Sequence, residues 1–139
     1  MRSYLAVLVG GLLGTALRLA CDLALPHGDD EFPFSTLAVN LVGAFVLGWL
    51  VGGLWTRPST PNWLKAGIGS GVIGSFTTMS AVLAAVVLLT GAGEAWLAIL
   101  YLAFSVVGGL GLAAGGLRIG SRIAHRPMPT TVTDAGQTL

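Results

Sequence analysis

Residues 64–90 read LKAGIGSGVIGSFTTMSAVLAAVVLLT, an apolar stretch whose centre is rich in glycine and hydroxyl groups. A bilayer core about 30 Å thick needs about 20 apolar residues per helix, and this stretch is long enough to cross it. Four hydroxyl side chains fall within GSFTTMS, at residues 74–80. Irregular backbone at that depth is tolerated only within protein or along a watery cavity. The stretch therefore predicts a membrane-spanning helix that is broken near mid-membrane.

The rest of the chain has the composition of a membrane protein. Of its 139 residues, 54% are hydrophobic and 9% are charged, whereas about a quarter are charged in soluble domains. Apolar stretches of spanning length also occupy residues 4–25, 34–55 and 95–117. The sequence predicts an all-α integral membrane protein with one four-helix domain over residues 1–120. Residues 121–139 are polar and lack hydrophobic periodicity, so we expect a disordered tail.

Charge is scarce but sorted along the chain. The net charge of +1 excludes a basic nucleic-acid binder, and the single Cys21 permits neither an intrachain disulfide nor a thiolate metal cage. The basic residues that would share one side of the membrane are Arg2, Arg57, Lys65, Arg118, Arg122 and Arg126. The acidic residues of the opposite connections are Asp29, Asp30, Glu31 and Glu94. This bias predicts a multi-pass protein of the plasma (inner) membrane with both termini in the cytoplasm.

Sixteen of the 21 glycines lie inside the four spans. Pairs spaced four apart are Gly10 and Gly14, Gly48 and Gly52, Gly67 and Gly71, and Gly111 and Gly115. Small residues on one stripe of a helix let neighbouring backbones approach closely in lipid. These pairs therefore predict tight helix packing.

A few polar side chains inside the spans are candidates for function. Asn40 is the only amide side chain in any span, with Thr36 one turn before it, and it must either bond a neighbouring helix or line a pore. Tyr101 and Ser105 share a face of the fourth span, which packing against glycine stripes would also explain. Arg18 lies one turn from Asp22, so it either forms a neutralised pair or draws anions into a vestibule.

The broken helix favours an ion site over a purely structural role for its hydroxyls. Freed carbonyls suit a hard cation such as Na⁺, and exposed amides suit an anion. No carboxylate lies deep in a span, which disfavours a small proton-coupled exporter. No nucleophile has a paired base, so we do not expect an enzyme. A structural or assembly protein without conduction remains an alternative.

Three motifs resemble those of the Fluc/CrcB family of small fluoride channels. GGLLGTALR at residues 10–18 is similar to the family's GGxxGAxxR. FSTLAVNLVGAFVLG at residues 34–48 is similar to GTLxVNxxGxFxLG, and GVIGSFTTMS at residues 71–80 is similar to GxxGGxTTFS. The resemblance extends over residues 4–118.

The resemblance implies an antiparallel dimer that exports fluoride passively and lowers its cytoplasmic level. It implies two fluoride pathways and a central structural Na⁺ bound by the backbone carbonyls of Gly74 and Thr77. The positions that match the fluoride pathway, or extend its polar track, are Asn40, Thr36, Thr78, Ser80, Tyr101 and Ser105.

The chain departs from the family at the two phenylalanines of TTFSTF, where it has Met79 and Val82. Electropositive ring edges that could face an anion are therefore missing. In addition, an antiparallel homodimer needs a chain that inserts both ways, whereas the basic residues here favour one orientation. We expect pairing with an oppositely oriented paralogue that supplies the rings, with a diverged homodimer as the alternative.

Overall fold

The computed structural model describes residues 1–26 and 32–124 of the chain. The segments long and apolar enough to cross a membrane are Arg2–Ala24, Phe34–Thr56, Asn62–Gly91 and Ala95–Ala124. No β-strand occurs among the described residues. The expected all-α fold with four spanning helices is confirmed. Most of the acidic connection before the second span, and the tail from residue 125 onward, lie outside the described residues.

The first span is α1 (Arg2–Ala24), and the second is α2 (Phe34–Gly52), followed by the short 3-10 turn η1 (Leu54–Thr56). The third consists of α3 (Asn62–Ala66), the π-helical η2 (Gly67–Ile73), α4 (Gly74–Phe76) and α5 (Met79–Gly91). The fourth consists of α6 (Ala95–Ala103), the π-helical η3 (Phe104–Gly108) and α7 (Gly109–Ala124).

Local sequence explains where these elements begin and turn. Pro61 directly precedes α3, where its missing N–H interrupts no helical hydrogen bond. Gly93 has a φ of 86° in the turn between α5 and α6, a conformation that favours glycine. The fourth span extends past Leu117 to Ala124, the last described residue, so it takes in the first residues of the expected tail. Gly120 lies against the backbone of Trp49, so packing holds the helix beyond its apolar stretch.

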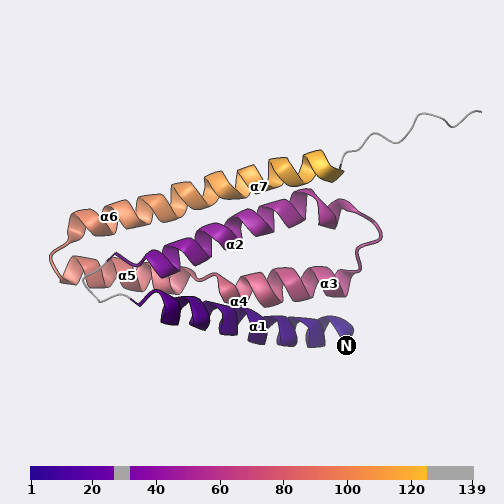
Figure 1. Ribbon diagram of the computed structural model, residues 1–139, viewed down its shortest axis with the longest axis horizontal. Coiled ribbons are helices and arrows are strands. Elements are labelled where there is room, and N and C mark those ends of the chain that lie inside the picture. The colour runs from indigo at the N-terminus through magenta and orange to yellow at the C-terminus, as the bar shows by residue number, and fades with distance from the viewer. Residues whose placement is uncertain (27–31, 125–139) are drawn as a thin grey trace, which may run out of the picture.

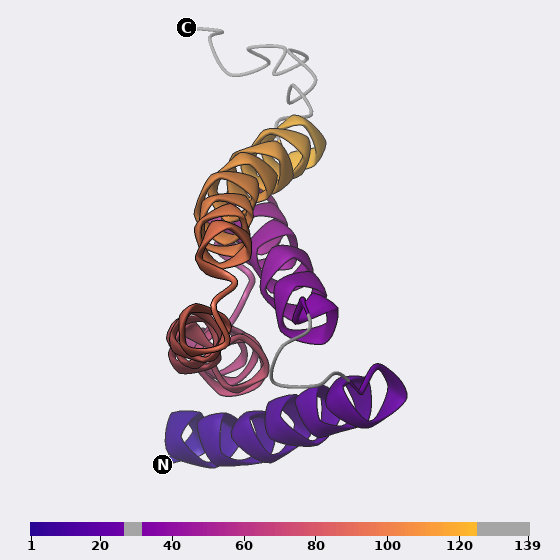
Figure 2. The same ribbon diagram turned by 90° about the vertical axis from the view of Figure 1, so that its left-hand side faces the viewer.

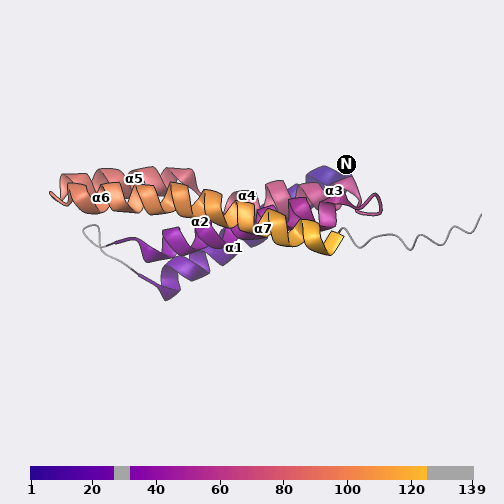
Figure 3. The same cartoon turned by 90° about the horizontal axis from the view of Figure 1, so that it is seen from above.

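The helices pack in pairs instead of closing around one common core. α1 lies along η2 and α4, α2 lies along α7, and α5 lies beside α6. Figure 1 shows α1 and α7 on opposite sides of the molecule. Figure 2, seen along the long axis, shows that the helices form an open array and not a closed bundle. From above, α5 and α6 extend together at one end (Figure 3). In the most apolar 18 residues of each spanning segment, between 11% and 33% are buried, so much apolar surface is left for lipid or for a second subunit.

Glycines make the closest of these contacts. Gly10 and Gly14 touch the backbone of η2, and Gly48 and Gly52 lie against Ala113 and Leu117 of α7. On α7, however, the packed glycines are Gly116 and Gly120. The expected pair Gly111 and Gly115 faces open space, with no atom within 4 Å of where a side chain would begin. Both pairs have the same spacing, so the sequence could not tell which of them faces α2.

The described charges separate along the molecule. The N-terminus, the connection before α3 and the end of α7 lie at one end of the molecule (Figure 1). The basic residues described there are Arg2, Arg57, Lys65, Arg118 and Arg122. Among the described residues the only carboxylate side chains are Asp22, in the last turn of α1, and Glu94, in the turn at the opposite end. The side of the membrane on which the basic end lies stays a prediction.

Candidate functional site

The third span contains an interruption between α4 and α5. Thr77 has φ −83° and ψ 154°, and Thr78 has φ −150° and ψ 127°, so both have extended backbone. The backbone N–H and the hydroxyl of Thr77 each donate to the carbonyl of Ile73, at 2.9 Å, which ends the first half of the span. The Thr78 hydroxyl accepts from the backbone N–H of Ala81 at 3.2 Å and caps α5.

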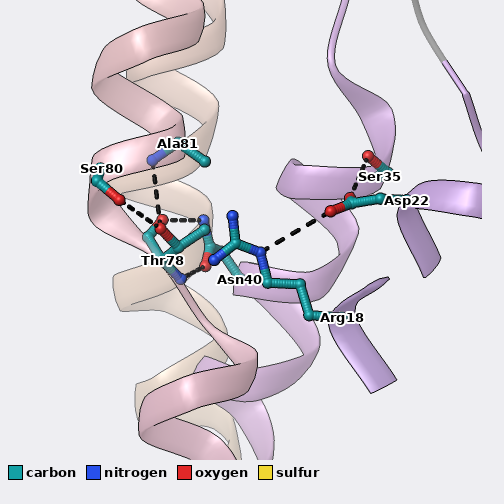
Figure 4. Close-up of polar contacts among 7 residues, drawn as sticks. All are labelled: Arg18, Asp22, Ser35, Asn40, Thr78, Ser80 and Ala81. Atoms are coloured by element: carbon teal, nitrogen blue, oxygen red, sulfur yellow. Dashed lines mark hydrogen bonds and ion pairs between the residues drawn. The ribbon is translucent and has the colours of Figure 1, made fainter. Parts of the chain in front are cut away.

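Asn40 of α2 bonds directly to this interruption (Figure 4). Its Nδ2 donates to the carbonyl of Thr78 at 2.9 Å, and its Oδ1 accepts from the backbone N–H of Thr78 at 2.7 Å. The two bonds fix the orientation of the amide, because the Thr78 N–H requires an oxygen opposite it. An amide nitrogen carries two N–H groups, so one donor of Asn40 is left for another partner.

These bonds also redirect two helical donors. In a regular α-helix the carbonyl of Gly74 would accept from the Thr78 N–H, and the carbonyl of Thr77 would accept from the Ala81 N–H. Here the Thr78 N–H donates to Asn40, and the Ala81 N–H donates to the Thr78 hydroxyl. The carbonyls of Gly74 and Thr77 therefore lack the donors that an uninterrupted helix would give them.

A groove of about 540 Å³ runs past the interruption. The predicted site residues that line it are Asn40, Gly74, Thr77, Thr78, Met79, Val82 and Ser105. Thr36 and Tyr101 are buried and do not line it. Ser80 is linked to the lining by a 2.9 Å hydrogen bond between its hydroxyl and that of Thr78. Segments far apart in the sequence thus contribute polar groups to one hollow.

Tyr101 and Ser105 place two further hydroxyls near the groove. The Tyr101 side chain is fully buried, and its ring meets Phe32 edge-on, with centroids 5.4 Å apart. Neither its hydroxyl nor that of Ser105 has a partner with hydrogen-bond geometry in the described part of the chain. A buried polar group left unpaired costs about 1–3 kcal/mol. Packing explains the Tyr101 ring, and the two hydroxyls lie near each other without forming a hydrogen bond of strict geometry.

The two positions where the family has phenylalanine differ in environment. Met79 is 58% exposed, and it lines the groove. Val82 is 1% exposed and packs with Leu89 and Tyr101 in a small apolar cluster. Met79 therefore lies open to the surroundings of the chain, whereas Val82 belongs to its core.

Arg18 lies outside the groove lining, in a polar chain that joins α1 to α2 (Figure 4). Its Nε is 3.9 Å from Oδ2 of Asp22, and Oδ1 of Asp22 accepts from the hydroxyl of Ser35 at 3.1 Å. The pair that the sequence offered as one alternative is thus present. A role for Arg18 in drawing anions stays a prediction.

Sequence reasoning did not anticipate the part played by Gly43. A side chain at this position would meet the Thr77 methyl group, so the absence of a side chain lets the interruption lie close to α2. The available signal was its position three residues after Asn40, on the same face of the helix. The apolar lining by Val106 and Leu110 gave no comparable signal in the sequence.

The fold and the groove together define a multi-pass helical membrane protein with a polar site at an interrupted helix. Residues 5–117 match the family described as CrcB-like protein, Camphor Resistance (CrcB), and the chain belongs to this family.

Several curated relatives of the chain are named as ion channels. A protein of Azotobacter vinelandii named fluoride-specific ion channel FluC is 44% identical over 107 residues, which cover 76% of this chain and 86% of the relative. A protein of Listeria innocua named fluoride-specific ion channel FluC 2 is 40% identical over 123 residues, with coverage of 88% and 94%. Another FluC 2, of Halalkalibacterium halodurans, is 38% identical over 128 residues and covers 91% of each chain. These names are those of ion channels and not of enzymes, in agreement with the class expected from the sequence.

Proposed function

We propose that the chain is a subunit of a fluoride channel through which fluoride leaves the cytoplasm passively. The names of the relatives and the four spanning helices support this class of protein. The observation that carries the proposal is the Asn40 amide, which Thr78 fixes at the groove with one N–H group to spare.

Fluoride holds its water tightly, so a pathway must offer donors that replace part of that water. Asn40 supplies an N–H, and the linked hydroxyls of Thr78 and Ser80 leave one O–H group free beside it, because the other is donated within the pair. The hydroxyls of Thr36, Tyr101 and Ser105 continue the donor set away from the interruption. The buried hydroxyls of Tyr101 and Ser105 support this role, since neither makes a hydrogen bond of strict geometry and an anion would satisfy them.

A structural Na⁺ belongs to the same proposal. The carbonyls of Gly74 and Thr77 would hold it, and their diverted helical donors make them suitable oxygen ligands. Carbonyl oxygen suits a hard monovalent cation. When bound, the ion supplies fixed positive charge that holds subunits together and is not transported. The residues present fit such an ion, because both carbonyls belong to the segment that lines the groove.

The complete channel requires a second subunit in the antiparallel orientation. The groove is open to the surroundings of the chain, and Met79 and Val82 provide no aromatic ring edge at the two family positions. Some relatives carry the numbered names FluC 1 and FluC 2, which is consistent with paired subunits. We therefore propose a paralogue of opposite orientation as the partner.

A non-conducting assembly subunit is the second candidate function, because the missing rings would impair a pathway built from this chain alone. A proton-coupled exporter has less support. Neither Asp22 nor Glu94, the only carboxylates on described side chains, lines the groove.

Fluoride efflux from liposomes, followed with a fluoride electrode, tests these proposals. We expect efflux when the chain is reconstituted with an oppositely biased paralogue, and little efflux when it is reconstituted alone. Fast efflux from the chain alone would contradict the need for a partner. Assembled subunits that release no fluoride in either preparation would contradict the channel and favour the assembly subunit.

A further inference from the structure

A second hollow lies away from the groove at the interruption of the third span. It lies between α1 and the first half of that span. It consists of two connected parts of about 420 and 210 Å³ that share Ala6, Val9 and Trp63. Gly10 and Gly67 line its inner part, where the backbones of the two helices are in close contact. Its lining is apolar except for Arg2 at the outer part. We call this hollow the α1–α3 groove.

The outer part of the α1–α3 groove has the residues of a membrane interface. Trp63 is 42% exposed, and tryptophan concentrates where lipid tails meet headgroups. Arg2 is exposed and makes no ion pair with any residue in the described ranges. Lys65 is close in sequence, but its ammonium group donates to the carbonyl of Trp55 at 2.8 Å. Arg2 is therefore the cation available at this groove.

The charged residues around the outer part of the α1–α3 groove also favour an anion at Arg2. The end of the molecule that holds the outer groove carries Arg2 of α1 and the basic residues Arg118 and Arg122 of α7 (Figure 1). Neither Asp22 nor Glu94, the two carboxylates on described side chains, lines the groove. An anionic group at Arg2 would thus meet positive charge, while the narrow apolar hollow continues inward along the helices.

We propose that the α1–α3 groove binds one anionic phospholipid, with an acyl chain along Val9 and Trp63 and the phosphate at Arg2. Basic pockets between spanning helices are suited to anionic headgroups, and each basic residue near the surface adds about 1 kcal/mol, or about fivefold in affinity. The proposal concerns the lipid contact alone and does not depend on which ion the channel conducts.

Native mass spectrometry of the full chain, titrated with dioleoyl phosphatidylglycerol or dioleoyl phosphatidylcholine, tests the proposal. We expect one retained phosphatidylglycerol, held about fivefold more tightly than phosphatidylcholine. Arg2→Gln should abolish this preference. Arg118→Gln is the matched control, because it removes the same charge from α7, on the opposite side of the molecule (Figure 2), and should keep the preference. Val9→Trp should fill the hollow and release the lipid with every charge intact.

Three results would overturn the proposal. Equal retention of the two lipids would show an apolar surface without headgroup recognition. Equal losses in Arg2→Gln and Arg118→Gln would show attraction to the basic end as a whole. Unchanged lipid retention together with altered dimerisation in Val9→Trp would show that a second copy of the chain occupies the groove.

Discussion

At the scale of single residues, Thr78 connects the two halves of the third span to α2. Its backbone N–H and carbonyl both bond Asn40, and its hydroxyl caps α5 and meets Ser80. Thr78 can bond α2 in this way because its extended backbone turns its N–H away from the helical carbonyl of Gly74.

The hydroxyl of Thr78 should therefore contribute measurably to stability. Thr78→Val keeps the shape but removes the cap, and we expect it to lower the free energy of unfolding by about 1 kcal/mol. Thr78→Ser keeps the hydroxyl and should remain close to the original chain. Denaturant unfolding in mixed micelles measures both variants. A loss in Thr78→Ser with none in Thr78→Val would assign the effect to the methyl group instead of the cap.

Asn40 shows how far sequence reasoning reaches at this scale. Its cost in lipid predicted either a bond to a neighbouring helix or a place at a pore. In the structure the side chain bonds the third span and lines the groove, so the two alternatives are compatible. The particular partner could not be predicted, because it depends on how α2 is placed against the third span. The roles of the site residues in conduction remain predictions.

At the scale of helices, the spans follow from hydropathy, and the first three begin and end within about two residues of the expected bounds. The fourth begins at Ala95 as expected but continues beyond Leu117. The π-helical segments η2 and η3 had no signal in the sequence pattern, because they depend on local hydrogen-bond register. The contacting face of α7 was also mispredicted. Four-residue spacing marks a glycine stripe, but two such stripes run along this helix.

Neighbouring glycines on α7 provide a direct test of its packing. A side chain at Gly116 would press on the carbonyl of Phe45, whereas one at Gly115 would meet nothing within 4 Å. We expect Gly116→Ala to destabilise the chain by about 1–3 kcal/mol through overpacking. Gly115→Ala should be neutral, or stabilising by up to about 1 kcal/mol through helix propensity. Thermal unfolding in detergent compares them, and equal stabilities would contradict the contact between α2 and α7.

At the scale of the whole molecule, charge and helix count agree with the sequence, whereas the open arrangement of the helix pairs was not foreseen. The order of the spans brings all described basic residues except Arg18 to one end, so the bias in the sequence becomes a property of the fold (Figure 1). The hydropathy pattern could not predict which apolar surfaces stay exposed in a single chain, because lipid or another subunit covers them.

The charge bias predicts a single orientation in the membrane. In a Cys21→Ser background, Ala92→Cys places a thiol in the turn between α5 and α6, and Ser59→Cys places one at the basic end. We expect an impermeant maleimide to label the first in intact cells, and the second only after permeabilisation. Partial labelling of both in intact cells would mean that the chain inserts both ways, as a homodimer of opposed subunits requires.

The most direct test of the proposed channel is fluoride efflux from liposomes that hold the conducting subunit pair, compared between the original chain and Asn40→Ala. We expect the variant to assemble and to lose efflux by about tenfold or more, because a hydrogen bond to a charged partner contributes about 1.5–3 kcal/mol. Thr90→Val is the control, since its hydroxyl bonds only within α5, outside the groove, and it should conduct as the original does. Unchanged fluoride efflux in an assembled Asn40→Ala channel would contradict the pathway through this groove.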